Sequence, residues 1–399
     1  MSVAARLFHI HARFIRSMSS VEDDVQDVGN LVYLIVMLHG VGTLMPWNMF
    51  ITIAPDYYTN YKMKTFDENG TAHATVYSAN FLNYLAIASQ IPNLLLNFIN
   101  IFVTVKGDLT KRISISLLIV GAMIVFTMSF VYVDTWKWMG TFFAITLLSI
   151  VLLNGANGIY QNSIFGLASD FPFKFTNAVI IGNNLCGTFV TIVNIITAFV
   201  SKNTANAAFA YFGISLFTLG VCFASFFLLK KQRFYQFYSK RAMMARQSEG
   251  TDSKPVLVLF QGWPQMINVY LVFFVSLSIF PGIMVDVRDE LIGQKYSFVL
   301  PERYFVPITC FLLFNVFAFI GSMLAGRYQY PGPKHLWMVV YPRLLFIPFF
   351  AFCNYRPLTR TWTVLFPSTW LYVFMGMIMS ISSGYLSGLA MMYPNRSNI

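Results

Sequence analysis

The amino-acid sequence predicts an all-α polytopic membrane protein with about ten transmembrane helices, and three observations support this class. Apolar residues make up 57% of the 399 residues and charged residues only 11%, whereas an average soluble domain is about a quarter charged. Apolar runs of membrane-spanning length recur along the whole chain. A net charge of +11 accompanies a mean hydropathy of +0.61, which is typical of a membrane protein rather than a nucleic-acid binder. A soluble globular enzyme is excluded.

The predicted spans are apolar runs bounded by charged residues, Pro or Gly. Each run has about 20 residues or more, enough to cross roughly 30 Å of hydrocarbon as a helix. The runs are 31–54, 77–104, 113–133, 139–168, 175–200, 206–229, 265–287, 301–326, 335–353 and 363–393.

Lys and Arg residues orient the predicted bundle, because cytoplasmic loops carry an excess of them. With the N-terminus inside, the inner segments hold 17 of the 27 Lys and Arg residues, and the outer loops hold nine. We therefore expect a cytosolic tail at 1–30, a six-helix half at 31–229, a cytosolic basic loop at 230–264 and a four-helix half at 265–399. An inverted bundle is the alternative.

A glycosylation sequon supports this orientation. Asn69-Gly70-Thr71 lies in the loop 55–76, and it predicts N-glycosylation of Asn69 where that loop faces a lumen or the exterior. Residues 1–21 contain three Arg and no acid, as in a mitochondrial transit peptide, but a cytosolic tail agrees better with glycosylation. We expect an integral protein of the plasma membrane with a cytosolic N-terminus, or alternatively of an intracellular organelle membrane.

Acidic residues are missing from the centres of the predicted spans. All sixteen Asp and Glu lie in tails, loops or span ends, and Asp286 is the deepest of them. An ion-coupled transporter generally needs an intramembrane carboxylate, so the sequence favours facilitated diffusion. Two basic residues are exceptions. For His39 we favour hydrogen bonding inside the bundle over a proton switch, and for Arg343 capping of backbone carbonyls over substrate binding.

Neutral amides take the place of charges inside the spans. Two sets recur at helical spacing and predict polar stripes on single helix faces. Such stripes often line a polar cavity, and the alternative is hydrogen bonding between helices. The stripes consist of Asn83, Gln90, Asn93 and Asn97 in 77–104, and of Asn154, Asn157 and Gln161 in 139–168.

Small residues and a proline predict local mobility. Gly42 and Pro46 are expected to loosen the first span beside Trp47, which is a candidate for stacking on a planar solute. Several glycines, Gly182 and Gly187 among them, are expected to let the spans 139–168 and 175–200 approach closely and slide.

Four motifs identify a family. They are HGVGTLMPWNMF at 39–50, QNSIFGLA at 161–168, RYFVPITCFLLFN at 303–315 and SSGYL at 382–386. At these motifs the chain resembles the equilibrative nucleoside transporter family. The resemblance implies a bundle similar to the major facilitator fold, alternating access, and purine and pyrimidine nucleosides as substrates, with nucleobases carried by some members.

The resemblance also implies roles for single residues. Leu44 and Trp47 match positions beside the base, and Gln161 matches the glutamine that hydrogen-bonds it. Gln90 and Asn93 flank a proline of the second span, where the family usually has Met and Leu, so a more polar pocket is expected.

The eighth span departs from the family pattern. The family has an Asp and an Arg that face the ribose, and here Ala318 and Ser322 stand in those places. Ribose recognition is then expected from neutral groups such as Asn315 and Ser322. The expected substrate-binding set is Leu44, Trp47, Gln90, Asn93, Asn157, Gln161, Asn315 and Ser322. The expected packing or gating set is Gly42, Pro46, Asn48, Gly182, Gly187 and Arg343.

We therefore expect a uniporter that moves nucleosides or nucleobases through the lipid bilayer without covalent chemistry, so not an enzyme. Four cysteines in apolar runs, without zinc-type spacing, predict neither a disulfide framework nor a metal site, and no cofactor is expected. The alternative is a receptor or scaffold that keeps the transporter fold without carrying anything. It arises because the family normally has eleven spans, one more than this chain, and because the Asp and Arg pair is missing.

Uptake should be unchanged when sodium is replaced by choline, and it should vary only weakly with pH, because the spans carry no carboxylate at membrane depth. Vesicle uptake of labelled uridine under matched gradients measures this. Accumulation of uridine against its concentration gradient would contradict uncoupled transport.

Overall fold

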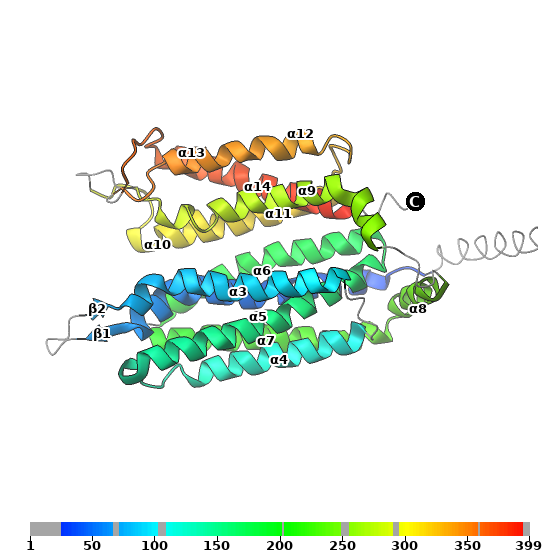
Figure 1. The fold of residues 1–399 in the computed structure, drawn as a ribbon, viewed down its shortest axis with the longest axis horizontal. Helices are drawn as coiled ribbons and strands as arrows, with labels where there is room; N and C mark the ends of the chain where they lie inside the picture. The colour runs from blue at the N-terminus through cyan, green and yellow to red at the C-terminus, as the bar shows by residue number, and fades with distance from the viewer. Residues whose placement is uncertain are drawn as a thin grey trace, which may run out of the picture.

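The computed structural model describes residues 25–66, 72–102, 109–201, 203–248, 255–289, 295–357 and 360–393. Within these ranges, eight helices are long and apolar enough to cross a membrane, and the apolar helical segment Trp337–Phe352 is shorter. Each of the ten predicted runs contains a helix, so the prediction of an all-helical polytopic bundle is confirmed. Figure 1 shows the long helices packed side by side, with their axes roughly parallel.

The first half of the bundle is built from six long helices. They form because their apolar runs are uninterrupted by charge, and the short turns between them end each helix near a polar residue or Pro. The helices are α2 (Leu31–Ile53), α3 (Val76–Phe102), α4 (Leu109–Ser129), α5 (Met139–Ser169), α6 (Phe173–Val200) and α7 (Thr204–Lys231).

Short elements cap this half. The 3-10 turn η1 (Val28–Asn30) precedes α2, and the π-helical segment η2 (Ala54–Lys62) follows it. An antiparallel pair comes next, β1 (Lys64–Phe66) and β2 (Ala72–Ala74). Asn69 lies outside the described residues, so its glycosylation stays a prediction.

The second half is less regular, since prolines interrupt two of its helices. Pro307 opens a π-helical stretch ahead of α11, and Pro342 lies in the 3-10 turn η7. The elements are α9 (Pro255–Ile279), η5 (Met284–Asp286), α10 (Glu302–Val306), η6 (Pro307–Leu312), α11 (Leu313–Arg327), α12 (Trp337–Val340), η7 (Tyr341–Leu345), α13 (Phe346–Phe352) and α14 (Thr369–Met392).

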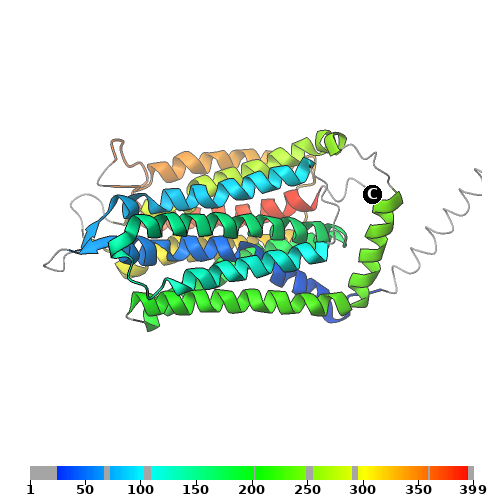
Figure 2. The same cartoon turned by 60° about the horizontal axis from the view of Figure 1, so that its bottom comes forward.

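An additional helix, α8 (Arg233–Ser248), lies across one end of the bundle (Figure 2). We call this the α8 end, and the opposite end, which carries β1 and β2, the hairpin end. The segment 230–264, expected as a loop, thus contains a helix, and α9 already begins at Pro255. Aromatic contacts hold α8 in place: the ring centroid of Phe234 lies 5.1 Å from that of Phe175 and 5.8 Å from that of Phe171.

Each half has its own buried core. One cluster of buried apolar residues belongs to the first half, and two smaller clusters belong to the second. The halves meet mainly where α6 contacts α11 and α14, which we call the seam. Two separately packed halves joined along one seam can shift as units, because neither core has to be opened.

Glycines set the closest helix contacts, at places other than those predicted. A Cβ on Gly182 would collide with the carbonyl oxygen of Met37 and with Gly40, so α6 packs closely on α2. A Cβ on Gly187 would collide with the Asn315 amide of α11. The prediction that these two glycines bring α5 and α6 together is wrong, because both lie on faces of α6 that contact other helices.

Gly182→Ala should lower the free energy of unfolding by about 1 to 3 kcal/mol, because the added methyl group overpacks against backbone that has no room to move. Thermal unfolding of the purified protein in detergent measures the change. Gly220→Ala on α7 is the control, since nothing lies within 4 Å of a Cβ there and Ala is the better helix former. Equal shifts in the two variants would contradict the close contact of α2 and α6.

Candidate functional site

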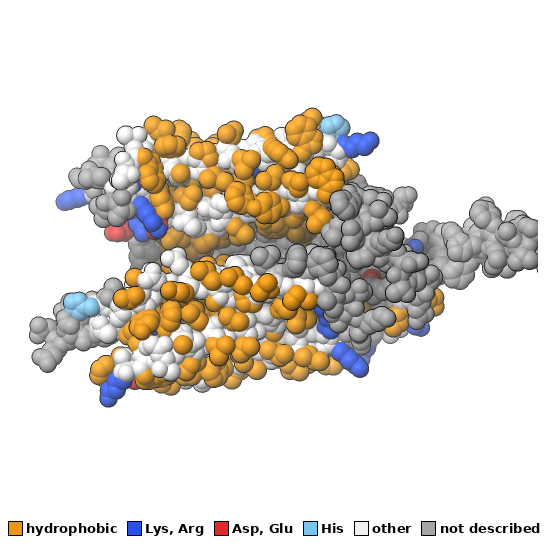
Figure 3. All heavy atoms as spheres, viewed as in Figure 1, with side chains coloured by type: hydrophobic (Ala, Val, Ile, Leu, Met, Phe, Trp, Pro, Cys, Tyr) orange, Lys and Arg blue, Asp and Glu red, His pale blue; other side chains and the backbone are white. Residues whose placement is uncertain are grey.

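A cavity of about 560 Å³ lies between the two halves, towards the α8 end. Its volume falls within the roughly 300 to 1,000 Å³ typical of small-molecule sites. A groove between the halves is visible on the face shown in Figure 3, where hydrophobic side chains cover the middle of the bundle and Lys and Arg lie mainly at its ends. The cavity is lined by Gln161, Asn162, Phe165, Ser169, Thr176, Gln265, Met266, Val269, Tyr270, Ala390 and Met391.

Neutral amides supply much of the polar wall of this cavity. Gln265 is held in place, because its Nε2 donates to the carbonyl oxygen of Pro333 at 2.8 Å and its Oε1 accepts from Asn268 at 3.3 Å. The Nδ2 of Asn162 is buried without a hydrogen-bond partner. Among the residues that the structure describes, none that lines the cavity is charged. The wall therefore suits a neutral solute that forms hydrogen bonds.

Gln161 is the predicted substrate-binding residue that lines this cavity. It is half-buried on α5, and the cavity lies between it and α9 of the other half. The remaining seven predicted residues are not part of the cavity wall, and the structure places them in four other environments.

Asn157 lies in the contact between α2 and α5. Its side chain is 1% exposed, and its Nδ2 donates to the carbonyl oxygen of Thr43 at 2.8 Å. The Thr43 hydroxyl donates in turn to Oδ1 of Asn183 on α6 at 2.7 Å. This amide therefore joins helices, which is the alternative that the sequence left open for the amide stripes.

Leu44 and Trp47 are half-buried on α2, away from Gln161. Because α2 and α5 are antiparallel where Thr43 contacts Asn157, Trp47 lies one helical turn towards the hairpin end and Gln161 one turn towards the α8 end. The two levels are about 12 Å apart along the bundle. The structure thus does not bring Trp47 and Gln161 into one cavity.

The residues expected to loosen α2 take part in packing. The helix continues through Gly42 and Pro46, and a Cβ on Gly42 would lie 2.8 Å from the Tyr160 hydroxyl. Asn48 is 8% exposed, and its Nδ2 contacts the carbonyl oxygen of Leu44 at 3.1 Å and the Cys186 sulfur at 3.8 Å.

The amides of α3 are the most accessible of those predicted. Gln90 and Asn83 are exposed, and Asn93 is half-buried beside α5. A Cβ on Gly158 would lie 3.5 Å from the Asn93 Oδ1. The side chain of Asn97 lies outside the described residues.

The polar residues of α11 are buried in the packing of this helix. Asn315 is 7% exposed, and its Nδ2 donates to the carbonyl oxygen of Phe311 at 2.9 Å. Ser322 is fully buried and donates to the carbonyl oxygen of Phe319 at 2.8 Å. Ala318 is buried against α14, where its backbone leaves no room for a Cβ on Gly384.

His39 is hydrogen-bonded through both ring nitrogens. Nδ1 lies 2.7 Å from the Tyr160 hydroxyl, and Nε2 lies 3.4 Å from the Ser225 hydroxyl. The ring is 1% exposed. The prediction of a hydrogen-bonded His39 inside the bundle is confirmed.

Arg343 is a buried cation that bonds backbone and hydroxyl oxygens. Its side chain is 3% exposed, and it donates to the carbonyl oxygen of Val272 at 2.9 Å and to the hydroxyls of Ser276 and Ser382 at 2.8 and 3.1 Å. These contacts connect η7 with α9 and α14. They support the packing role that was favoured for Arg343, which stays a prediction.

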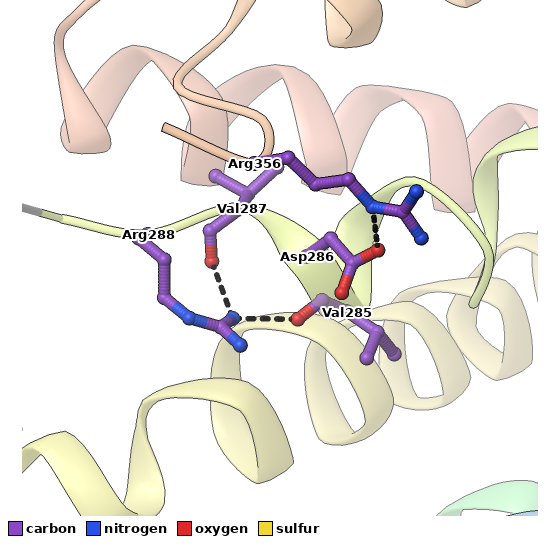
Figure 4. Close-up of polar contacts among 5 residues, drawn as sticks. All are labelled: Val285, Asp286, Val287, Arg288 and Arg356. Carbon is purple, nitrogen blue, oxygen red and sulfur yellow. Dashed lines mark hydrogen bonds and ion pairs between the residues drawn. The ribbon is translucent and has the colours of Figure 1, made fainter. Parts of the chain in front are cut away.

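Asp286, the deepest acid in the sequence, is paired at the hairpin end of the second half (Figure 4). Its Oδ2 accepts from Nε of Arg356 at 2.6 Å, and this hydrogen bond raises the pKa of the Arg356 guanidinium. Arg288 donates to the carbonyl oxygens of Val285 and Val287 at 2.7 and 3.1 Å. The carboxylate therefore links η5 to the segment after α13 at the hairpin end, and it does not line the described cavity.

The bundle and its cavity define a class of protein, a polytopic helical membrane protein built from two halves with a cavity between them. The fold is similar to that of the proton:xylose symporter XylE of the major facilitator superfamily, with a TM-score of 0.53 over 91% of this chain and 87% of that chain, at 10% identity. Residues 147–398 match the family model described as nucleoside transporter. The chain belongs to the nucleoside transporter family.

Several curated relatives cover most of the chain. Human equilibrative nucleoside transporter 1 is 27% identical over 92% of this chain and 90% of its own length. Equilibrative nucleoside transporter 3 of Rattus norvegicus is 27% identical over 92% of this chain and 82% of its own length. Equilibrative nucleotide transporter 1 of Arabidopsis thaliana is 25% identical over 93% of this chain and 80% of its own length. The resemblance seen in the sequence motifs is confirmed, and the chain belongs to a family of transporters and not of enzymes.

The sequence did not point to several residues of the cavity wall. Asn162, Thr176, Gln265 and Tyr270 come from three helices and line the cavity together with Gln161. Asn162 follows Gln161 directly, so it lies about 100° further round α5, outside the predicted stripe. Gln265 lies at the predicted start of its span, where an amide is common and gives no signal of its own.

Arg343→Lys should lower the free energy of unfolding by about 1 to 3 kcal/mol, because an ammonium group cannot reach all the oxygens that the guanidinium bonds, and some would stay buried without a donor. Thermal unfolding in detergent measures the loss. Arg356→Lys is the control, since the Arg356 side chain is 57% exposed and surface pairs contribute little. A shift for Arg343→Lys no larger than the control would contradict the packing role.

Proposed function

We propose that this protein carries nucleosides, and also nucleobases, down their concentration gradient by alternating access. The observation that carries the proposal is the uncharged, amide-lined cavity at the junction of the two halves, in a chain whose relatives include transporters named for nucleosides. A nucleoside is neutral and presents donors and acceptors on its base and sugar. The cavity offers amide groups that match both kinds.

The binding groups proposed for the base are Gln161 and Asn162. Gln161 offers a donor and an acceptor from one amide, and Asn162 has an unpartnered Nδ2. The ring of Tyr270 across the cavity is 63% exposed, so it has a face available for stacking on a planar base.

Transport requires that the two halves shift about the seam. We propose that Leu44 and Trp47 contact the base at a level of the pathway nearer the hairpin end, while Gln161 and Asn162 contact it at the α8 end. Gln90 and Asn93 of α3 are proposed to supply further neutral polar groups. Asn157, Asn315 and Ser322 would contribute to binding only after they leave the packing contacts described above. The half-buried or exposed state of four of these side chains, Leu44, Trp47, Gln90 and Asn93, supports a pathway position.

The proposed orientation places the α8 end in the cytosol. The positive-inside distribution of Lys and Arg supports it, and so does the sequon at Asn69, which would then face the exterior or a lumen. We propose the plasma membrane, with an intracellular organelle membrane as the alternative.

Uptake of labelled uridine, adenosine and hypoxanthine into proteoliposomes containing the purified full chain tests the function. We expect saturable uptake that stops when inner and outer concentrations are equal. Gln161→Ala and Asn162→Ala should each lower the transport efficiency by about three- to tenfold, the effect of losing one hydrogen bond. Thr218→Ala is the control, because its exposed hydroxyl bonds the backbone of its own helix, at Ile214.

Two outcomes would contradict the proposal in different ways. The absence of saturable flux for all three solutes in folded, reconstituted protein would favour the receptor or scaffold alternative, which the replacement of charged residues at Ala318 and Ser322 suggests. Saturable flux that Gln161→Ala and Asn162→Ala leave unchanged would keep the transport function and reject this cavity as the binding site.

A further inference from the structure

A second pocket, of about 270 Å³, opens on the seam at the α8 end. It is separate from the solute cavity, since the two share no lining residue. α6 of the first half and α11 of the second half both contribute to its wall, with Tyr33 of α2 and Met392 of α14 beside them. Anything bound in this pocket therefore touches both halves.

Two cations from opposite halves line this pocket. Lys174 comes from the start of α6 and Arg327 from the end of α11. No acid lines the pocket, and in the part of the chain that the structure describes neither cation forms an ion pair. Two like charges facing one pocket repel each other, and an anion between them would remove that repulsion.

The start of α6 adds to this positive field. The helix begins at Phe173 after Pro172, without a side-chain cap and without an acid in its first turn. Phe173 and Lys174 both line the pocket. The helix dipole at such a terminus favours a phosphate or another anion.

Asn177 is the buried polar group of the pocket. Its side chain is 3% exposed, and its Oδ1 has no hydrogen-bond partner. The amide lies on the seam, because a Cβ on Gly326 of α11 would be 2.7 Å from its Nδ2 and a Cβ on Gly388 of α14 would be 3.3 Å from its Oδ1. An unpartnered acceptor on a residue of the pocket wall, which two cations also line, suits an anion whose attached group carries a hydroxyl donor.

We propose that this pocket binds a phosphate ester with a neighbouring hydroxyl group, and that the bound ester links the two halves at the α8 end. Arg327 and Lys174 bond the phosphate oxygens, and Asn177 accepts from the hydroxyl group. The ester belongs either to the headgroup of an anionic lipid or to a soluble metabolite. If the chain transports by alternating access, as proposed above, the bound ester slows the step in which this end of the seam opens.

Binding is tested without any transport measurement. Thermal unfolding of the purified full chain is followed with glycerol phosphate in detergent, and separately in nanodiscs of phosphatidylcholine with or without phosphatidylglycerol. We expect a higher unfolding temperature in at least one arm. A response to glycerol phosphate identifies a soluble ester as a ligand, and a response to phosphatidylglycerol alone identifies a lipid headgroup.

Charge-matched variants distinguish binding at this pocket from a non-specific effect of positive charge at the same end of the protein. The pair Lys174→Gln and Arg327→Gln should weaken the apparent affinity at least about tenfold, because two charge-assisted contacts are lost. The pair Lys231→Gln and Arg233→Gln removes the same two charge types from exposed positions at the same end, and it should keep the wild-type response. Stabilisation in neither arm, or an equal loss in both double variants, would overturn the site.

A transport measurement gives a second test that does not depend on the binding result. Uridine efflux from proteoliposomes containing phosphatidylglycerol should be faster for the variant pair at Lys174 and Arg327 than for the wild type. Binding without any uridine flux would leave the site standing and reject the proposed function. Flux without binding would reject the site alone.

Discussion

Polar groups inside this bundle depend on hydrogen bonds within the protein, because the hydrocarbon around it offers none. This constraint decides where the amides and the two basic residues of the spans lie. Asn157 bonds the backbone of α2, His39 uses both ring nitrogens, and Arg343 donates to oxygens of two helices. These groups hold helices together. The cavity between the two halves is lined by other amides, which are Gln161 and Asn162 of α5 and Gln265 of α9.

The sequence was sufficient to predict the apolar helices of the bundle and their order. Length and hydropathy decide which segments cross a membrane, and each predicted run contains a helix. α8 escaped prediction because a basic segment of 16 residues has no long apolar run. Its aromatic residues Phe234 and Tyr235 pack on Phe171 of the α5–α6 turn, and Phe234 also packs on Phe175 at the start of α6. These contacts join segments that are far apart in the sequence. The residue pattern within either segment cannot predict them.

The site could be predicted only in part, for a related reason. Helical spacing tells which residues share a face, but not what lies opposite that face. Gln161 and Asn157 belong to one stripe, and the structure places the first at a cavity and the second against Thr43. Gly182 and Gly187 likewise mark close contacts, but with α2 and α11 rather than with α5. The neutral character of the cavity wall, by contrast, follows directly from where the sequence lacks acids.

The helix across the α8 end limits how far the halves can separate. α8 is fastened to the first half by its aromatic contacts, and the chain must reach from Ser248 to Pro255, where α9 of the second half begins. Fully extended, that stretch of backbone spans at most roughly 25 Å. The covalent chain therefore acts as a tether of fixed maximum length, so any opening at this end is bounded whatever solute or membrane surrounds the protein.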